Sequence, residues 1–357
     1  MSDIAIVGAG LMGSALCWPL TDNGHRVRLV GTHLDREIIC SCLHNGYHPK
    51  LQRYLPAGVT PYYVEDLPRA LEGVDVVVSG VNSLGVHWIG RSLAPWLRPG
   101  STIIAVTKGL EATDKGDLLL LPDVLAGEFP APLRDRIAFA AIGGPCIAGE
   151  LAGRRPTCVV FASRRRDALQ RLRAIFRTSY YHIWLSTDVV GVEVCAALKN
   201  AYALAVGLAA GMLERRGGAD EAGACMHNTA AAIFAQSAVE MRHLVSALGG
   251  SPDKVGSLPG VGDQYVTCAG GRTVRLGRLL GKGLSFSQAR EEMAGETIES
   301  AYVIMQLAKA LPELERRGLI ASQDLPLLRL LCRVITEEAP LELEFDTFFG
   351  GDCSDYL

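Results

Sequence analysis

Lys199 stands in an otherwise apolar segment and is the first candidate for chemistry. The stretch CAALKNAYALAVGLAAGM (195–212) is made of small and apolar residues and carries a single charge, on Lys199. Burial disfavours an unpaired ammonium and lowers the pKa of a lysine toward neutrality. Such an amine is suited to proton transfer with a substrate hydroxyl. The alternative is a lysine at a helix edge, with its stem buried and its head in water.

Three further side chains have types and positions that suit a hydride-transfer site. Lys108 follows a predicted strand in IIAVTKGLE, at the sheet edge where open parallel sheets bind ligands. Asp263, in GVGDQY, is suited to orient a lysine, and Arg272, in GGRTVR, to bind a phosphate. The alternatives are a surface lysine in a loop and an ordinary Gly-Asp turn.

A glycine-rich turn near the N-terminus predicts a dinucleotide cofactor. IAIVGAGLMGSAL places Gly8, Gly10 and Gly13 in GxGxxG spacing, with Leu11 and Met12 between the last two. Such glycines permit a tight turn, close approach of a pyrophosphate and close helix–strand packing. The motif follows an apolar strand and opens a helix, which is the context that the cofactor site requires.

The end of the second predicted strand leaves the choice between NAD and NADP open. An acidic residue there would bind the ribose hydroxyls of NAD, and an arginine would favour the 2′-phosphate of NADP. The tip has Thr32 and His33, whereas Asp35 and Arg36 come slightly later. We expect Thr32 and His33 to contact the cofactor.

The elements that must position these residues change in type along the chain. Continuous apolar runs predict strands in the first half, separated by helical segments, and this alternation indicates a doubly wound parallel sheet of the Rossmann type. The predicted strands are 4–7, 26–30, 74–79, 102–106, 138–142, 158–162 and 182–185.

The second half reads as entirely helical. Helical patterns cover 189–213, 219–248, 287–317 and 324–337, and a glycine-rich loop, SLPGVGDQYVTCAGGR, lies between them. We therefore expect two domains, a nucleotide-binding domain at 1–187 and an all-α substrate and catalytic domain at 188–357.

Composition narrows the possible partners. The chain is 49% hydrophobic with a formal net charge of −3, so its composition does not indicate binding to nucleic acid.

The cysteines and the apolar segments bear on metal binding and location. The ten cysteines lack zinc spacing, so we predict no metal and a reducing cytoplasmic location. A strand is predicted almost from the first residue of this sequence, so we expect no signal peptide. The apolar run 189–213 contains Glu193 and Lys199, so we expect a core helix and no membrane span.

Taken together, these motifs resemble the NAD(P)-dependent glycerol-3-phosphate dehydrogenase family over nearly the whole chain. They occur in the family's order: GAGLMGSAL, HPKLQRYLP, TKGLE, GGPCIAGELAGRRPT, GVEVCAALKNAYALAVGL, NTAAAI, GVGDQYVTCAGGR and GETIES. The GVE…ALKN and GD…TC…R segments are far more specific than the glycine turn.

The resemblance implies a reaction and roles for residues. The enzyme would interconvert sn-glycerol 3-phosphate and dihydroxyacetone phosphate, often as a homodimer. Lys199 would exchange the proton with the substrate, Asp263 would hold it and the reacting hydroxyl, and Lys108 would contact substrate and cofactor. The remaining implied contacts are Gly144, Cys146, Gly271, Arg272 and Thr273 for the substrate, and Ala148, Arg272 and Glu299 for the cofactor.

Departures from the family pattern affect the substrate's phosphate end. The usual Ser-Arg-Asn is Gly271-Arg272-Thr273 here, GPN or GPS has become GPC at Cys146, and Ala235-Gln236 stands where an arginine is expected. A different polyol phosphate, sugar phosphate or hydroxy acid is therefore an alternative substrate. A non-catalytic nucleotide sensor is a third hypothesis.

Overall fold

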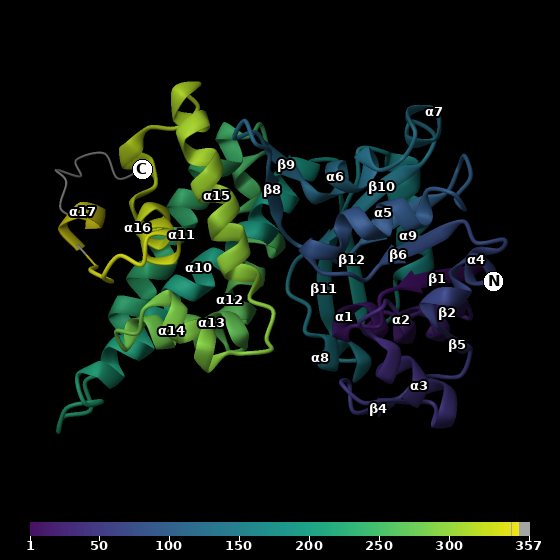
Figure 1. Ribbon diagram of the computed structural model, residues 1–357, viewed down its shortest axis with the longest axis horizontal. Helices are drawn as coiled ribbons and strands as arrows, with labels where there is room; N and C mark the ends of the chain where they lie inside the picture. Colours follow the sequence, from purple (N-terminus) through teal and green to yellow (C-terminus); the bar gives the residue numbers. More distant parts are fainter. Residues whose placement is uncertain (344, 350–357) are drawn as a thin grey trace. The chain divides into compact units, whose positions relative to one another are not determined.

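The computed structural model describes residues 1–343 and 345–349 and divides into two compact units (Figure 1). The first unit comprises Met1–Lys108 and Leu120–Glu193. The second begins at Val194 and also takes in Gly109–Leu119. The sequence pattern did not indicate this short excursion of the chain, which forms the hairpin of β8 (Leu110–Ala112) and β9 (Leu118–Leu120).

The first unit is built on one eight-stranded sheet. Its order is β12-β11-β10-β7-β6-β1-β2-β5. The seven predicted strands are present, with ends shifted by no more than two residues. The strands are β1 (Asp3–Val7), β2 (Arg26–Val30), β5 (Val59–Tyr62), β6 (Val76–Ser79), β7 (Thr102–Ala105), β10 (Ala138–Gly143), β11 (Thr157–Ala162) and β12 (Tyr181–Ser186). The pattern missed β5, because the edge strand VTPY is short and contains a proline.

One pairing differs from the predicted all-parallel sheet. β10 and β11 are antiparallel, with Ile142 opposite Phe161, whereas the other neighbours in the sheet are parallel. The chain leaves β10 at Gly144, forms the five-residue α8 (Ala148–Ala152) and re-enters the sheet from that same edge. Runs of apolar residues do not report strand direction, so the sequence could not reveal this reversal.

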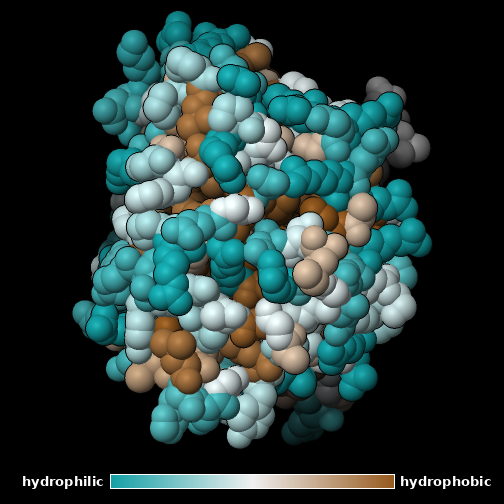
Figure 2. All heavy atoms as spheres, turned by 90° about the vertical axis from the view of Figure 1, so that its right-hand side faces the viewer, coloured by the Kyte–Doolittle hydropathy of each residue, from teal (hydrophilic) through white to brown (hydrophobic). Residues whose placement is uncertain are grey.

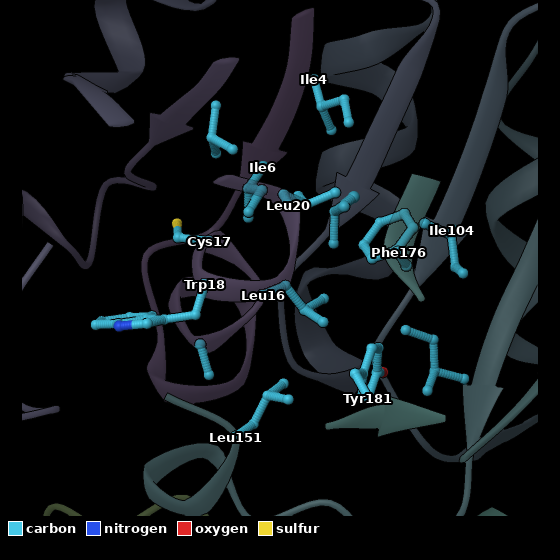
Figure 3. Packing of buried hydrophobic residues seen from close by; sticks show 14 of the residues in the cluster. Ile4, Ile6, Leu16, Cys17, Trp18, Leu20, Ile104, Leu151, Phe176 and Tyr181 are labelled. Carbon is cyan, nitrogen blue, oxygen red and sulfur yellow. The ribbon is translucent and has the colours of Figure 1, made fainter. Parts of the chain in front are cut away.

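The glycine turn is anchored by an apolar core on the sheet. α1 (Leu11–Ala15) and α2 (Cys17–Asp22) follow the turn, and Leu16 and Leu20 are fully buried. Figure 3 shows them packed beside Ile6 of β1 and Phe176, in the same cluster as Ile104 of β7. The other helices of this unit are α3 (Arg36–Asn45), α4 (Leu67–Leu71), α5 (Val86–Leu93), α6 (Leu121–Gly127), α7 (Ala131–Arg134) and α9 (Arg166–Phe176), and β3 (Tyr47–His48) pairs with β4 (Arg53–Tyr54).

The second unit is helical around α10 (Val189–Arg215). Within the described residues, α10 is the one helix long and apolar enough to cross a membrane, but 89% of its most apolar window is buried. It is therefore a core helix, as predicted.

Figure 2 shows a face of the first unit, and hydrophilic residues cover most of it.

Two of the four helical predictions need correction. The helix predicted at 219–248 is α11 (His227–Ala247), since the GGADEAGA stretch before it contains too many turn-forming residues. The helix predicted at 287–317 is two helices, α14 (Phe286–Glu292) and α15 (Glu299–Arg316), separated by a turn at Gly295 with φ of 84°. The last of the four is α16 (Pro326–Thr336), close to its prediction.

The predicted glycine-rich loop is largely helical. A π-helical turn (Leu258–Gly262) leads into α12 (Asp263–Cys268), and α13 (Arg272–Gly281) follows. Asp263 is thus the first residue of a helix and not a simple turn residue. The sequence did not indicate these helices because glycine lowers helix propensity. In the folded protein, close packing overrides that preference.

Small residues let α13 approach α10 closely. A Cβ at Gly277 would lie 2.0 Å from the carbonyl oxygen of Leu204, and one at Gly211 would lie 2.0 Å from that of Arg278. Such distances are far below van der Waals contact, so only glycine fits at these two positions. The contact fixes the helix that begins at Arg272 against the helix that carries Lys199.

Candidate active site

The second unit supplies the buried lysine with partners. Lys199 Nζ lies 2.7 Å from Asp263 Oδ1 and 2.8 Å from Thr267 Oγ1. The side chain of Lys199 is 11% exposed and that of Asp263 is 1% exposed. A buried ammonium is tolerable when a carboxylate faces it and hydrogen bonds complete its surroundings. The structure thus joins Lys199 and Asp263, from α10 and α12, and rules out a lysine whose head lies in open water.

Thr267 was missed by sequence reasoning. It lies four residues after Asp263 on α12, and this spacing places both side chains on one face of the helix. Its hydroxyl donates to the backbone carbonyl of Asp263 at 2.7 Å, so its lone pairs face the Lys199 ammonium. The neighbouring Cys268 remains a thiol, since burial raises its pKa to about 11 although Lys199 opposes the shift.

In the first unit, Lys108 and Gly144 meet at the carboxyl ends of adjacent strands. β7 and β10 are parallel neighbours, and Lys108 Nζ donates to the carbonyl oxygen of Gly144 at 3.2 Å. Ligands bind at this edge of open α/β sheets. The structure thereby brings together two predicted substrate-binding residues.

Glu193 is a second residue that the sequence reasoning did not single out for the site. It is fully buried, and both carboxyl oxygens are without a hydrogen-bond partner among the residues that the structure describes. Burial raises the pKa of Glu193 to about 8, and the positive charge of Lys108 opposes this rise. At neutral pH the carboxyl group is therefore mainly protonated.

The glycine turn has the close backbone contacts that its spacing predicts. Gly8 has φ of 112°, and a Cβ there would lie 2.6 Å from the backbone carbon of Gly80. A Cβ at Gly13 would lie 2.5 Å from the carbonyl oxygen of Gly8. Gly80 directly follows β6 and is equally constrained, since a Cβ there would lie 2.6 Å from the carbonyl oxygen of Gly8. The glycine motif gave no reason to single out Gly80.

Gly10 differs from its neighbours. It has an ordinary φ of −68°, and a Cβ there would meet no atom nearer than 3.8 Å. The protein itself therefore has space for a side chain at position 10. A glycine is needed there only if something outside the protein approaches the backbone, and a pyrophosphate fits that requirement.

The tip of β2 is more constrained than expected. Thr32 is buried, and both its N–H and its hydroxyl donate to Asp35 Oδ2, at 2.9 and 2.8 Å. His33 is exposed and meets Trp88 edge-to-face, with ring centroids 5.8 Å apart. Arg36 is exposed and pairs with Glu65.

The other predicted contacts are placed separately within each unit. Cys146 and Ala148 pack partly buried against the core of the first unit, and α8, which begins at Ala148, lies against α1. In the second unit, Gly271 has φ of 93° and precedes α13, whose first turn contains the exposed Arg272 and the half-buried Thr273. Glu299 begins α15. These placements leave the roles of the residues as predictions.

Comparisons with known proteins cover nearly the whole chain. The family model for the NAD-dependent glycerol-3-phosphate dehydrogenase N-terminus matches residues 3–169, and the model for the C-terminus matches residues 188–345. The NADP(+)-dependent glycerol-3-phosphate dehydrogenase of Archaeoglobus fulgidus is 38% identical over 290 residues, which are 81% of this chain and 83% of that protein. A glycerol-3-phosphate dehydrogenase [NAD(P)+] of Shouchella clausii is 32% identical over 340 residues, covering 94% of this chain and 92% of the relative.

A solved structure agrees with these sequence matches. The crystal structure of glycerol-3-phosphate dehydrogenase from Coxiella burnetii has a TM-score of 0.79 and 28% identity, and the match covers 95% of this chain and 96% of that one. One family accounts for the glycine turn, for the buried lysine–aspartate pair and for the matches in both halves of the chain. The chain belongs to the NAD-dependent glycerol-3-phosphate dehydrogenase family.

Proposed function

We propose that this enzyme interconverts sn-glycerol 3-phosphate and dihydroxyacetone phosphate with NAD(P), and that Lys199 carries the proton. The supporting observation is the buried Lys199, whose Nζ contacts both Asp263 and Thr267. Binding a nucleotide alone does not require a proton-handling group of this kind. The names of the relatives support the same reaction.

The buried group has a defined task in each direction. When the ketone is reduced, the Lys199 ammonium donates a proton to the carbonyl oxygen as the alcohol forms. When the alcohol is oxidised, the amine accepts the proton of the carbinol hydroxyl. Asp263 stabilises the ammonium, and Thr267 fixes its direction. The nicotinamide cofactor, when bound, supplies or accepts the hydride.

The glycine turn holds the cofactor in this proposal. The unfilled space beside Gly10 and the crowded backbone at Gly8 and Gly13 suit a pyrophosphate. Lys108, Ala148, Thr32 and His33 are its further contacts in the first unit, and Arg272 and Glu299 in the second. Both NAD and NADP are compatible with the family.

Recognition of the phosphate end is the point at which this chain departs from its family. We assign the phosphate to Arg272, with the backbone at Gly271 and the side chain of Thr273 beside it, and the rest of the substrate to Lys108, Gly144 and Cys146. The small Gly271 and short Thr273 favour a second candidate, the same hydride chemistry on another polyol phosphate, sugar phosphate or hydroxy acid.

One assay separates the candidates. Purified protein is mixed with NADH or NADPH and dihydroxyacetone phosphate, and oxidation of the reduced nucleotide is followed by absorbance. We expect turnover, with sn-glycerol 3-phosphate as the product. A larger kcat/KM on another member of a panel of phosphorylated and unphosphorylated ketones would favour the second candidate. Tight nucleotide binding without turnover on any ketone would instead indicate a sensor.

We also infer a cytoplasmic location and a homodimer. Apart from Cys40 and Cys42, the ten cysteines are scattered singly along the chain, which supports a reducing compartment. Dimerisation is a property of many members of the family. Light scattering on the purified protein measures the assembly state directly.

A further inference from the structure

The glycine turn is held from outside by two side chains that the proposed mechanism does not use. The N–H of Ala9 donates to Asp35 Oδ2 at 3.1 Å, and the carbonyl oxygen of Ala9 lies 3.0 Å from His48 Nε2. His48 belongs to the HPKLQRYLP motif, which acquired no role in the sequence reasoning. Both Ala9 and His48 are fully buried.

The hydrogen bonds of His48 define its protonation. The N–H of Leu51 donates to Nδ1 at 3.1 Å, so Nδ1 is an acceptor and carries no proton. Nε2 therefore carries the proton and donates it to the carbonyl oxygen of Ala9. Burial lowers the pKa of His48. The charge of Asp35 raises this pKa, whereas the charge of Lys50 lowers it. The imidazole is neutral and present as a single tautomer.

The hydrogen bond from His48 to the carbonyl of Ala9 also sets the direction of the Gly10 N–H, on the other side of the same peptide. A trans peptide is planar, and its C=O and N–H point in opposite directions. With the carbonyl of Ala9 directed to His48, the N–H of Gly10 points away from the imidazole. Within the described chain no acceptor is recorded for this N–H. Gly10 is also the position where the protein has room for a side chain and yet has none.

We propose that His48 is a positioning residue for dinucleotide binding, which turns the Ala9–Gly10 peptide so that the Gly10 N–H faces the pyrophosphate. Asp35 fixes the same residue from the other side, because its carboxylate accepts a hydrogen bond from the N–H of Ala9. The N–H and the hydroxyl of Thr32 both donate to this carboxylate and orient it. This inference rests on the proposed cofactor. It assigns to the buried histidine a role in cofactor affinity and none in proton transfer to the substrate.

The test uses variants that separate the two hydrogen bonds of His48. His48→Asn keeps an acceptor for the N–H of Leu51 but is too short to reach Ala9. His48→Gln extends an amide N–H to the Nε2 position and should restore the bond to Ala9. His48→Phe keeps a ring of similar size and makes neither bond. His25→Asn is the matched control, because His25 Nδ1 also accepts a backbone N–H, that of Ser2, at the opposite end of β1.

We expect His48→Asn and His48→Phe to weaken binding of NADH, NADPH and ADP-ribose by roughly tenfold, the effect of losing one charge-assisted phosphate contact. His48→Gln should bind within about threefold of wild type. KM for the dinucleotide should rise, while kcat at saturating dinucleotide and KM for dihydroxyacetone phosphate should change by less than about twofold.

Several outcomes overturn the inference. Unchanged dinucleotide Kd in the folded Asn or Phe variant shows that His48 supports the fold only. An equal rise in every KM, or failure of Gln to restore binding, has the same meaning. If His48→Asn does not fold, the comparison between Phe and Gln decides. Failure of the wild-type protein to bind any dinucleotide would instead overturn the proposed function.

Discussion

At the scale of single residues, burial of charge decides what the site can do. Lys199 and Asp263 are both buried, so removing either leaves the other as a charge in a poorly solvated place. Stability does not account for the pair, since apolar residues of similar size often stabilise a core equally well. In the proposed mechanism, the pair keeps a proton available at a fixed position.

Replacing Lys199 tests this directly. We predict that Lys199→Ala lowers kcat by about 10² or more, because the proton-transfer group is lost. Thr267→Ala is the matched control, since it keeps the amine and its ion pair, and should lose much less. Steady-state kinetics with both nucleotides measure the effect, and added small primary amines should partly rescue the Ala variant. Wild-type kcat in Lys199→Ala would exclude this lysine from the chemistry.

Arg272 should act on binding and leave the chemical step largely intact. We predict that Arg272→Ala raises KM for dihydroxyacetone phosphate by roughly tenfold to a hundredfold, the usual effect of losing a charged phosphate contact, with a smaller change in kcat. Arg278→Ala is the control, since Arg278 lies on the same helix and pairs with Glu214. An unchanged KM in the Arg272 variant would place the phosphate elsewhere.

At the scale of elements, a buried carboxylate and a glycine contact hold the helices of the second unit together. Glu240 of α11 accepts hydrogen bonds from Tyr202 of α10 at 3.0 Å and from the N–H groups of Leu327 and Leu328 in α16 at 2.7 and 2.9 Å. Burial raises the pKa of Glu240 to about 7 against the effect of these donors. One side chain thus links three helices, and the packing of α13 on α10 adds a fourth.

The glycine contact between α10 and α13 makes a prediction at this scale. We expect Gly277→Ala to lower the free energy of unfolding by about 1–3 kcal/mol, because the new methyl would overlap the Leu204 carbonyl unless the helices separate. Gly256→Ala, whose Cβ would meet nothing nearer than 3.9 Å, is the control. Urea unfolding measures both. Equal stability of the two variants would mean that α13 is not held by this contact.

At the scale of the whole molecule, buried carboxyl groups couple stability to pH. The pKa of Glu193 is raised to about 8 in the folded chain, whereas the unfolded group has an ordinary value near 4.5. Between these values the folded protein binds more protons than the unfolded protein. Stability therefore falls as the pH rises through this window. Glu240 contributes in the same direction at somewhat lower pH.

Glu193→Gln should remove one part of this dependence. We predict that wild type loses a few kcal/mol more than the variant between pH 5 and pH 9, because an amide cannot ionise. Glu72→Gln, an exposed position in the same unit, should behave like wild type. The measurement is the free energy of unfolding in urea at pH 5, 7 and 9. Parallel pH profiles for wild type and Glu193→Gln would show that the pKa of Glu193 is the same in the folded and the unfolded protein.

The sequence alone carried much of the fold and most of the candidate site. Apolar runs located seven strands of the sheet because buried strands need continuous hydrophobic residues, and the glycine turn was recognisable from spacing. The pairing of Lys199 with Asp263 was implied by the resemblance to the dehydrogenase family. The candidate site residues could be recognised because each of them lies in a short sequence segment whose composition indicates its chemistry.

Only the tertiary structure decided the rest. The antiparallel pairing of β10 and β11, the helices within the glycine-rich segment and the contact of Gly277 with Leu204 depend on partners distant in sequence. The same holds for Thr267 on Lys199 and for His48 on the Ala9 carbonyl. A sequence states which groups exist along the chain. Strand direction, close approach and burial arise from packing between segments, and these determine which of the groups meet.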